Sequence, residues 1–161
     1  MQSLPMKGTP PLPAPTRRRA AGLFAAAAAV ALLPRPSRAQ VAAATEAALA
    51  RVRAGRTPVE GRITLRAPAI AENGNAVPLT VQVESPMTAA DHVTRIHVFA
   101  NGNPTPEVAS FQLTPAMGRA QVDTRIRLGQ TQDVIVLAET SDGGLFTARA
   151  EVKVTIGGCG G

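Results

Sequence analysis

Residues 120–138 read AQVDTRIRLGQTQDVIVLA, and this stretch decides the fold class. From Ala120 to Leu128, small or apolar side chains alternate with polar ones, which is the pattern of a β-strand with one buried face. Residues 133–138 form a nearly continuous apolar run, as in a central strand covered on both sides. A half-buried strand followed closely by a fully buried one predicts layered β-structure.

A pattern of short predicted strands extends over residues 58–156. Short runs of β-branched and apolar residues are separated by Gly, Pro, Asn and Asp about every 8 to 12 residues, a spacing typical of an all-β sandwich. Alternation within residues 92–100 is imperfect, so either both faces of that strand are partly covered or a bulge interrupts it. The remaining predicted strands are one opening at Ile63 and Leu65, then 77–83, 107–113 and 146–156.

A short helix is expected before the sandwich. Residues 41–54, VAAATEAALARVRA, have high helix propensity, and Gly55 follows as a stop. The apolar positions are mostly alanine, which buries little area. We therefore expect residues 40–57 to form a helix and linker packed at the domain edge or on a partner.

Residues 1–39 have the pattern of an export signal. Three arginines at 17–19 precede an uncharged run over 20–33, and Ser37-Arg38-Ala39 offers small residues before a cleavage position. That run has 14 residues, whereas about 20 are needed to span a bilayer, which disfavours a membrane anchor. The weakly hydrophobic run after the arginines resembles a twin-arginine signal, although no Phe lies two residues beyond the arginine pair. We expect a protein located outside the cytoplasm.

The basic character of the chain comes from this segment. The net charge is +6, yet six of the 17 basic residues precede Gln40 and all 11 acidic residues follow it. A chain beginning at Gln40 carries 11 basic and 11 acidic side chains. Trp and Tyr are absent, so neither the charge nor the stacking surface of a nucleic-acid-binding protein is present.

The only cysteine, Cys159, lies in the terminal sequence VTIGGCGG between Gly157-Gly158 and Gly160-Gly161. Fixing a backbone residue costs about 1 to 2 kcal/mol, and glycine loses the most freedom. Residues 157–161 have little to offset that cost and are predicted to form a flexible arm. An extended chain carries Cys159 roughly 10 Å beyond Ile156, which suits a thiol inserted into the active sites of other proteins.

Nothing in the sequence activates this thiol. Lowering a cysteine pKa requires a nearby cation, helix N-terminus or metal, and the nearest basic residue is Lys153 on the preceding strand. We expect a partner to activate Cys159, so the chain is not itself an enzyme. No metal site is predicted, because His92 and His97 are an odd number of residues apart and fall on opposite faces of a regular strand.

Two other classes of protein remain open on these residues. An exported adhesion or assembly domain could use its odd cysteine for an intermolecular disulfide. A ubiquitin-like carrier could activate the final Gly-Gly as a thiocarboxylate, although the export signal separates such a chain from ATP. Prenylation is excluded, because the fourth residue from the end is Gly158 rather than cysteine.

The chain resembles the SoxY family, the sulfur carriers of the bacterial thiosulfate-oxidising system. The terminal VKVTIGGCGG matches the C-terminus of that family. Three blocks of the body match as well, namely AENGNAVPLTVQVESPMTAADHV, RIHVFANGNPTPEVASFQLTPA and DTRIRLGQTQDVIVLAETSDG. The resemblance covers about Glu72 to Gly161, and nothing in the terminal motif departs from the family pattern.

The resemblance implies an immunoglobulin-like sandwich in the periplasm and a heterodimer with the small β protein SoxZ. It implies that Cys159 holds the sulfur substrate covalently and that the carrier has no cofactor of its own. Three enzymes of the family's pathway are implied as partners: a haem c enzyme that couples thiosulfate to the thiol, a dimanganese hydrolase that releases sulfate, and a molybdenum sulfane dehydrogenase.

Overall fold

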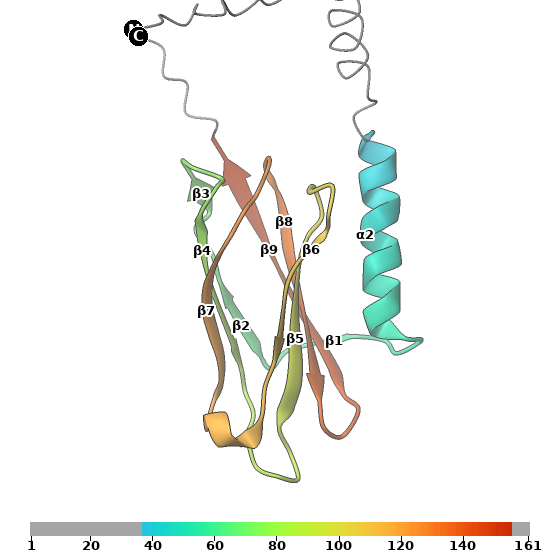
Figure 1. Cartoon of the computed structure of the whole chain (residues 1–161), viewed down its shortest axis with the longest axis vertical. Coiled ribbons are helices and arrows are strands. Elements are labelled where there is room, and N and C mark those ends of the chain that lie inside the picture. Colours follow the sequence, from blue (N-terminus) through green and yellow to red (C-terminus); the bar gives the residue numbers. More distant parts are fainter. Residues whose placement is uncertain (1–36, 156–161) are drawn as a thin grey trace, which may run out of the picture. The chain divides into compact units, whose positions relative to one another are not determined.

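A computed structural model describes residues 37–155 of the chain. Its strands form two layers (Figure 1). One sheet has the order β1-β9-β8-β5-β6, with β3 also paired to β9, and the other has the order β2-β4-β7. The elements are α2 (Arg38–Arg53), β1 (Val59–Glu60), β2 (Ile63–Arg66), β3 (Ile70–Ala71), β4 (Val77–Val83), β5 (Val93–Ala100), β6 (Glu107–Gln112), the 3-10 helix η1 (Pro115–Met117), β7 (Ala120–Ile126), β8 (Gln132–Thr140) and β9 (Leu145–Val154).

The predicted immunoglobulin-like β-sandwich with an N-terminal helix is confirmed. β4 pairs antiparallel with β7, with Val81 opposite Val122, and alternate residues of β4 are buried as the sequence pattern predicts. These side chains meet those of the larger sheet in the main core, whose fully buried members include Val81, Ile96 and Val136. Each fully buried Val, Leu or Ile contributes roughly 1.5–3 kcal/mol, so this core is the main source of stability.

Both explanations offered for the irregular strand hold at once. β5 is buried on both faces over Ile96–Ala100, and its register shifts between Val93 and Arg95 against β8 and between Val98 and Phe99 against β6. β8, the next strand in the sheet, is buried on both faces as its continuous apolar run predicts. The second face of both strands is covered by the helix.

Helix α2 packs on the larger sheet rather than at the domain edge. Its Ala48 and Leu49 are 1% exposed, and they form a second apolar cluster with side chains from the outer faces of β5, β8 and β9. The sheet residues of this cluster are Phe99, Ile135, Leu137 and Leu145. Residues 45, 48, 49 and 52 have the spacing of one helix face. On this face Leu49 and Val52 bury the apolar area that the alanines of the helix do not supply.

The helix begins earlier than predicted because Ser37 forms a capping box. The Ser37 hydroxyl accepts from the Gln40 amide, and the Gln40 side chain accepts from the Ser37 amide at 2.7 Å. The helix ends at Arg53, one residue earlier than predicted, because Ala54 adopts the left-handed conformation with φ 47° in place of Gly55. No helix in residues 37–155 is long and apolar enough to cross a bilayer.

Two short strands were not predicted. β1 and β3 both pair in parallel with β9, with Val59 opposite Phe146 and Ile70 opposite Lys153. Between β1 and β3 the chain crosses to the other sheet and forms β2. β1 and β3 therefore each pair with β9 over only two residues. A two-residue strand is too short to show a period-two pattern. β9 ends at Val154, and Ile156, where the sequence predicted its end, lies outside the described residues.

Candidate functional site

The predicted attachment residue Cys159 lies outside the described residues, and so do Gly157, Gly158, Gly160 and Gly161. The structure does describe the root from which these residues continue, which is the end of β9. We therefore build the site from the residues that fix this root. We call the end of the sandwich at which β9 finishes the arm end.

The last residues of β9 are held from two sides. On one side, the Thr155 amide donates to the Ala71 carbonyl at 3.0 Å, extending the parallel pairing with β3. On the other side, the Val154 amide donates to the Thr131 hydroxyl at 3.0 Å. The root is therefore fixed up to Thr155, four residues before the cysteine.

Three connections form the arm end around this root: the β3–β4 turn (72–76), the β5–β6 loop (101–106) and the β7–β8 turn (127–131). The turn predicted at Asn73-Gly74-Asn75 is present, with the Asn75 amide donating to the Asn73 side chain at 2.9 Å. Gly74 is needed for close packing as well, because a Cβ there would lie 2.2 Å from the Leu128 carbonyl oxygen and 2.9 Å from Val154 Cγ1.

Side-chain amides join the β5–β6 loop to the β7–β8 turn. Buried Gln132 accepts from the Gly102 amide at 2.6 Å and donates to the Asn103 side chain at 2.9 Å. Asn103 in turn donates to the Arg127 carbonyl at 2.8 Å and accepts from the Gly129 amide at 3.1 Å. These neutral bonds satisfy the backbone groups of both connections, so the two loops are held together near the root.

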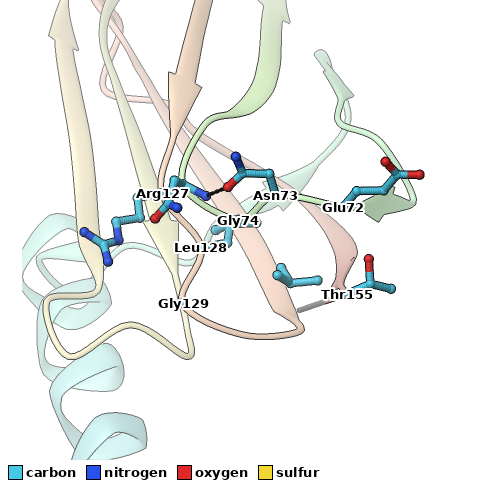
Figure 2. A pocket seen from close by; sticks show the side chains of 9 residues that line it. Glu72, Asn73, Gly74, Arg127, Leu128, Gly129 and Thr155 are labelled. Atoms are coloured by element: carbon cyan, nitrogen blue, oxygen red, sulfur yellow. Dashed lines mark hydrogen bonds between the residues drawn. The ribbon is translucent and has the colours of Figure 1, made fainter. Parts of the chain in front are cut away.

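A cavity of about 410 Å³ adjoins the root, between the β3–β4 turn, the β7–β8 turn and the end of β9 (Figure 2). Its charged lining residues, Glu72 and Arg127, lie on opposite sides of it with their side chains directed apart. They are the only charged residues in the three connections, and neither forms an ion pair with another residue of the range 37–155. The three connections therefore offer many neutral hydrogen-bonding groups and only two charges, and exposed Lys153 lies beside them at the end of β9.

The opposite end of the sandwich, which we call the far end, comprises residues 54–62, 84–92, 114–119 and 141–144 and is rich in charge. Arg56 donates at 2.6 Å to Glu139, which lies at the adjoining end of β8, and also to the Gly143 carbonyl. Arg62 lies 3.9 Å from Asp91. Burial alone would raise the pKa of Glu139, but hydrogen bonds from Arg56 and His97 outweigh it and lower that pKa below its ordinary value.

His97 is a structural residue in this arrangement. Its two ring nitrogens each lie 3.1 Å from a carboxylate oxygen, one of Glu107 and one of Glu139, and its side chain is 7% exposed. The Ser110 hydroxyl also lies 3.3 Å from Nδ1, so both ring nitrogens have partners within the domain. No group of three or more metal-ligating side chains occurs within residues 37–155.

Sequence reasoning located the cysteine but missed the side chains that position its strand. Thr131 and Gln132 lie between the strands predicted at 120–128 and 133–138, and their partners are about 20 to 30 residues away in the chain. The one local signal was the Asn-Gly-Asn turn at 73–75. Its meaning as a packing site depends on the contacts of Gly74 with Leu128 and Val154.

Comparisons with known proteins agree with this architecture. The sequence profile of the family described as sulfur oxidation protein SoxY matches residues 49–159. The solved structure of the sulfur carrier protein SoxY from Chlorobium limicola f thiosulfatophilum is 38% identical, covers 71% of this chain and 99% of that chain, and has a TM-score of 0.57.

A superoxide reductase (neelaredoxin) from Ignicoccus hospitalis shares the fold alone, at 20% identity, with 59% of this chain and 81% of that chain covered and a TM-score of 0.53. No curated protein matches the sequence. The family match spans more than half of the chain and reaches the cysteine, and with the 38% identical structure it settles the family. The chain is therefore a member of the SoxY family of sulfur oxidation proteins.

Proposed function

We propose that this protein is a periplasmic sulfur carrier that holds thiosulfate-derived intermediates covalently on Cys159 and presents them to the enzymes of thiosulfate oxidation. The chain performs no turnover alone. Residues 1–39 direct its export by the twin-arginine route, residues 58–156 form the carrier domain, and residues 157–161 are the flexible arm. A SoxZ-type subunit completes the carrier as a heterodimer.

The chemistry on the arm follows from the nucleophilicity of a thiolate. A haem c enzyme joins the Cys159 sulfur to the sulfane sulfur of thiosulfate, with loss of one proton and two electrons to the haem partner, and leaves a cysteine S-thiosulfonate. A dimanganese hydrolase adds water to release sulfate and leaves a cysteine persulfide. A molybdenum dehydrogenase oxidises the remaining sulfane sulfur where that enzyme is present.

One observation carries the proposal: the family match includes the chain's only cysteine, which lies five residues beyond the end of β9, and that strand end is anchored on both sides. An anchored root supports the idea of a tether that starts from a defined point. The glycines on either side of the cysteine remove every Cβ that could obstruct a narrow channel.

Mass spectrometry of the chain isolated from thiosulfate-grown cells tests this function. We expect a thiosulfonate or persulfide adduct on the peptide that contains Cys159, and none in cells grown without reduced sulfur. A stable protein disulfide at Cys159 in place of these adducts would favour an adhesion or assembly role instead. An adduct at the Gly161 carboxyl would indicate a thiocarboxylate carrier.

A further inference from the structure

We propose that Asn73, in the β3–β4 turn (72–76), is a site of spontaneous deamidation in the folded protein, and that the fold protects the chain's other Asn-Gly pair, Asn101-Gly102. All four asparagines of the chain lie in two Asn-Gly-Asn sequences, 73–75 and 101–103. Both sequences belong to connections of the arm end. The reaction involves only the backbone and amide groups of these connections, so it is independent of the proposed carrier function.

Deamidation needs no reagent other than water. The backbone nitrogen of the residue after asparagine bonds to the side-chain Cγ, and the side-chain nitrogen leaves as ammonia, taking the proton of the attacking amide. Water then opens the resulting succinimide ring. Cleavage of the ring bond to the side-chain carbonyl gives aspartate, and cleavage of the bond to the backbone carbonyl gives isoaspartate. Glycine after the asparagine favours ring closure, because it has no Cβ and its backbone is permissive.

At Asn73 the reacting groups are accessible. The Asn73 side chain is exposed and lines the cavity beside the root (Figure 2). Its oxygen accepts from the Asn75 amide at 2.9 Å, and this bond stabilises the negative charge that the oxygen gains as the ring closes. Among residues 37–155, none accepts a hydrogen bond from the Gly74 amide. The attacking nitrogen therefore has no hydrogen bond within the domain to break first.

The second Asn-Gly pair has the opposite geometry. The Gly102 amide donates to the Gln132 side chain at 2.6 Å, so the attacking nitrogen is already bonded. The Asn101 side chain is half-buried, and Asp133 holds both its ends: the side-chain nitrogen donates to the carboxylate and the oxygen accepts from the Asp133 amide, each at 3.0 Å. An ionised carboxylate only accepts, so it gives no proton to the leaving ammonia. Ring closure at Asn101 therefore requires local opening of the loop.

The remaining candidates for the same ring are also hindered. Asn103 precedes proline, which has no backbone N–H to lose. Asn75 precedes alanine, whose methyl group crowds the attacking nitrogen. Asp142-Gly143 could form the ring with loss of water, but the Gly143 amide donates to the Thr140 carbonyl at 3.0 Å. Asn73 is therefore the position at which the folded domain should react first.

Modification of Asn73 would alter the turn that packs on the root of residues 156–161. The Leu128 amide donates to the Gly74 carbonyl at 2.7 Å, and Gly74 lies so close to Leu128 and Val154 that even a Cβ does not fit. Isoaspartate adds a methylene group to the backbone of this turn, so we expect it to break the bond between Leu128 and Gly74. Aspartate keeps the backbone length, and its carboxylate can still accept from the Asn75 amide.

Incubation of the purified full-length protein at mildly alkaline pH, in buffer and in concentrated urea, tests this assignment. Peptide mapping by mass spectrometry follows conversion at Asn73 and Asn101 in the same sample, so each protein serves as its own control. In the folded protein we expect conversion at Asn73 to be at least about tenfold faster than at Asn101, because Asn101 and Gly102 must first lose several hydrogen bonds. In urea the two rates should be similar.

Two variants identify the protecting bond. Gln132→Leu frees the Gly102 amide and should speed conversion at Asn101 in buffer. Gln130→Leu is the matched control, because the Gln130 side chain donates to the Gly102 carbonyl and leaves the amide bonded to Gln132. It should keep the wild-type rate at Asn101, and both variants should keep the wild-type rate at Asn73.

Hydrogen exchange of the Leu128 amide measures the effect on the turn. The fraction that contains isoaspartate should exchange this amide faster than Asn73→Asp, which has the new charge on a normal backbone. Equal exchange would contradict the predicted loss of the bond to Gly74.

Conversion as slow at Asn73 as at Asn101 in the folded protein would overturn the proposal. A difference of the same size in urea would also overturn it, because the flanking residues rather than the fold would then set the two rates. An unchanged rate at Asn101 in Gln132→Leu would show that the bond to Gly102 gives no protection.

Discussion

The two ends of this sandwich are stabilised by different chemistry. At the arm end, the connections around the root of residues 156–161 are joined by neutral amides and hydroxyls, chiefly Gln132, Asn103 and Thr131. At the far end, Arg56 and Arg62 pair with Glu139 and Asp91. Neutral hydrogen bonds respond little to pH and salt, whereas ion pairs respond to both. The end assigned to the chemistry is thus the one whose geometry is least dependent on conditions.

The largest effect expected at the arm end is functional and leaves the fold intact. Cys159→Ser should abolish formation of the sulfur adduct, because a hydroxyl at neutral pH does not replace the thiolate. Its free energy of unfolding should change by less than about 0.5 kcal/mol, since the residue follows the last strand. Adduct mass and urea denaturation check both results. A loss of stability comparable to a core truncation, about 2–5 kcal/mol, would show that the thiol is packed in the domain.

Gly74→Val tests close packing at the arm end. A Cβ at this position would overlap the Leu128 carbonyl and the Val154 side chain, so the turn must move away from the root. We expect a loss of about 1–3 kcal/mol in the free energy of unfolding, measured by urea denaturation. Gly129→Val is the matched control in the neighbouring turn, where the nearest atom to a new Cβ is Asn103 Oδ1 at 3.6 Å. Equal losses in the two variants would contradict the role given to Gly74.

At the far end, Glu139→Gln should produce a loss that depends on pH. The folded-state pKa of Glu139 lies below its ordinary value of 4.5, so its contribution is present above that pH and is lost as the pH falls through the folded-state pKa. We expect the free energy of unfolding to fall by about 1.5 kcal/mol at neutral pH and by less in acid. Urea denaturation at several pH values measures this change.

Arg56→Met supplies the control for this pair. Combined with Glu139→Gln in a double-mutant cycle, it should show a coupling between the two changes at neutral pH, because each removes the same 2.6 Å contact. Additive losses, or a loss from Glu139→Gln that is the same in acid, would mean that the ion pair does not stabilise this end.

The smallest effect is expected from Thr131→Val, which removes the acceptor of the Val154 amide. The bond is neutral and exposed, so the loss should be about 0.5–1 kcal/mol and independent of pH. Faster hydrogen exchange at the Val154 amide should accompany it, while amides of the β8–β9 hairpin near residues 141–144 keep their wild-type rates. No change at Val154 would show that β3 alone fixes the root.

Local patterns were sufficient to predict the layers of this fold. Alternation in 77–83 and 120–128 and the apolar run in 133–138 predicted one-sided and two-sided burial, and the structure confirms both. The position of the helix could not be predicted, because its stripe of Ala48 and Leu49 does not reveal which sheet face it meets. The two-sided burial of β5 and β8 was the only sign that a further layer was needed.

The candidate site, too, could be predicted from the sequence only in part. The cysteine and its glycines are evident in the sequence because composition alone makes them unusual. The anchoring of the root depends on pairs such as Thr131 with Val154 and Gln132 with Gly102, which only the folded chain brings together. Single polar residues in turns carry no signal of such contacts, since turns are polar for many reasons.

Hydrogen-exchange mass spectrometry of the wild-type protein, with and without the enzyme that loads Cys159, shows directly which end of the sandwich that enzyme covers. Because the thiol is carried on a short arm that follows Thr155, we expect slower exchange on complex formation in residues 72–76, 101–106 and 127–131, and unchanged exchange in residues 84–92 and 141–144. Protection confined to the far end, or to the outer surface of the helix, would contradict this expectation.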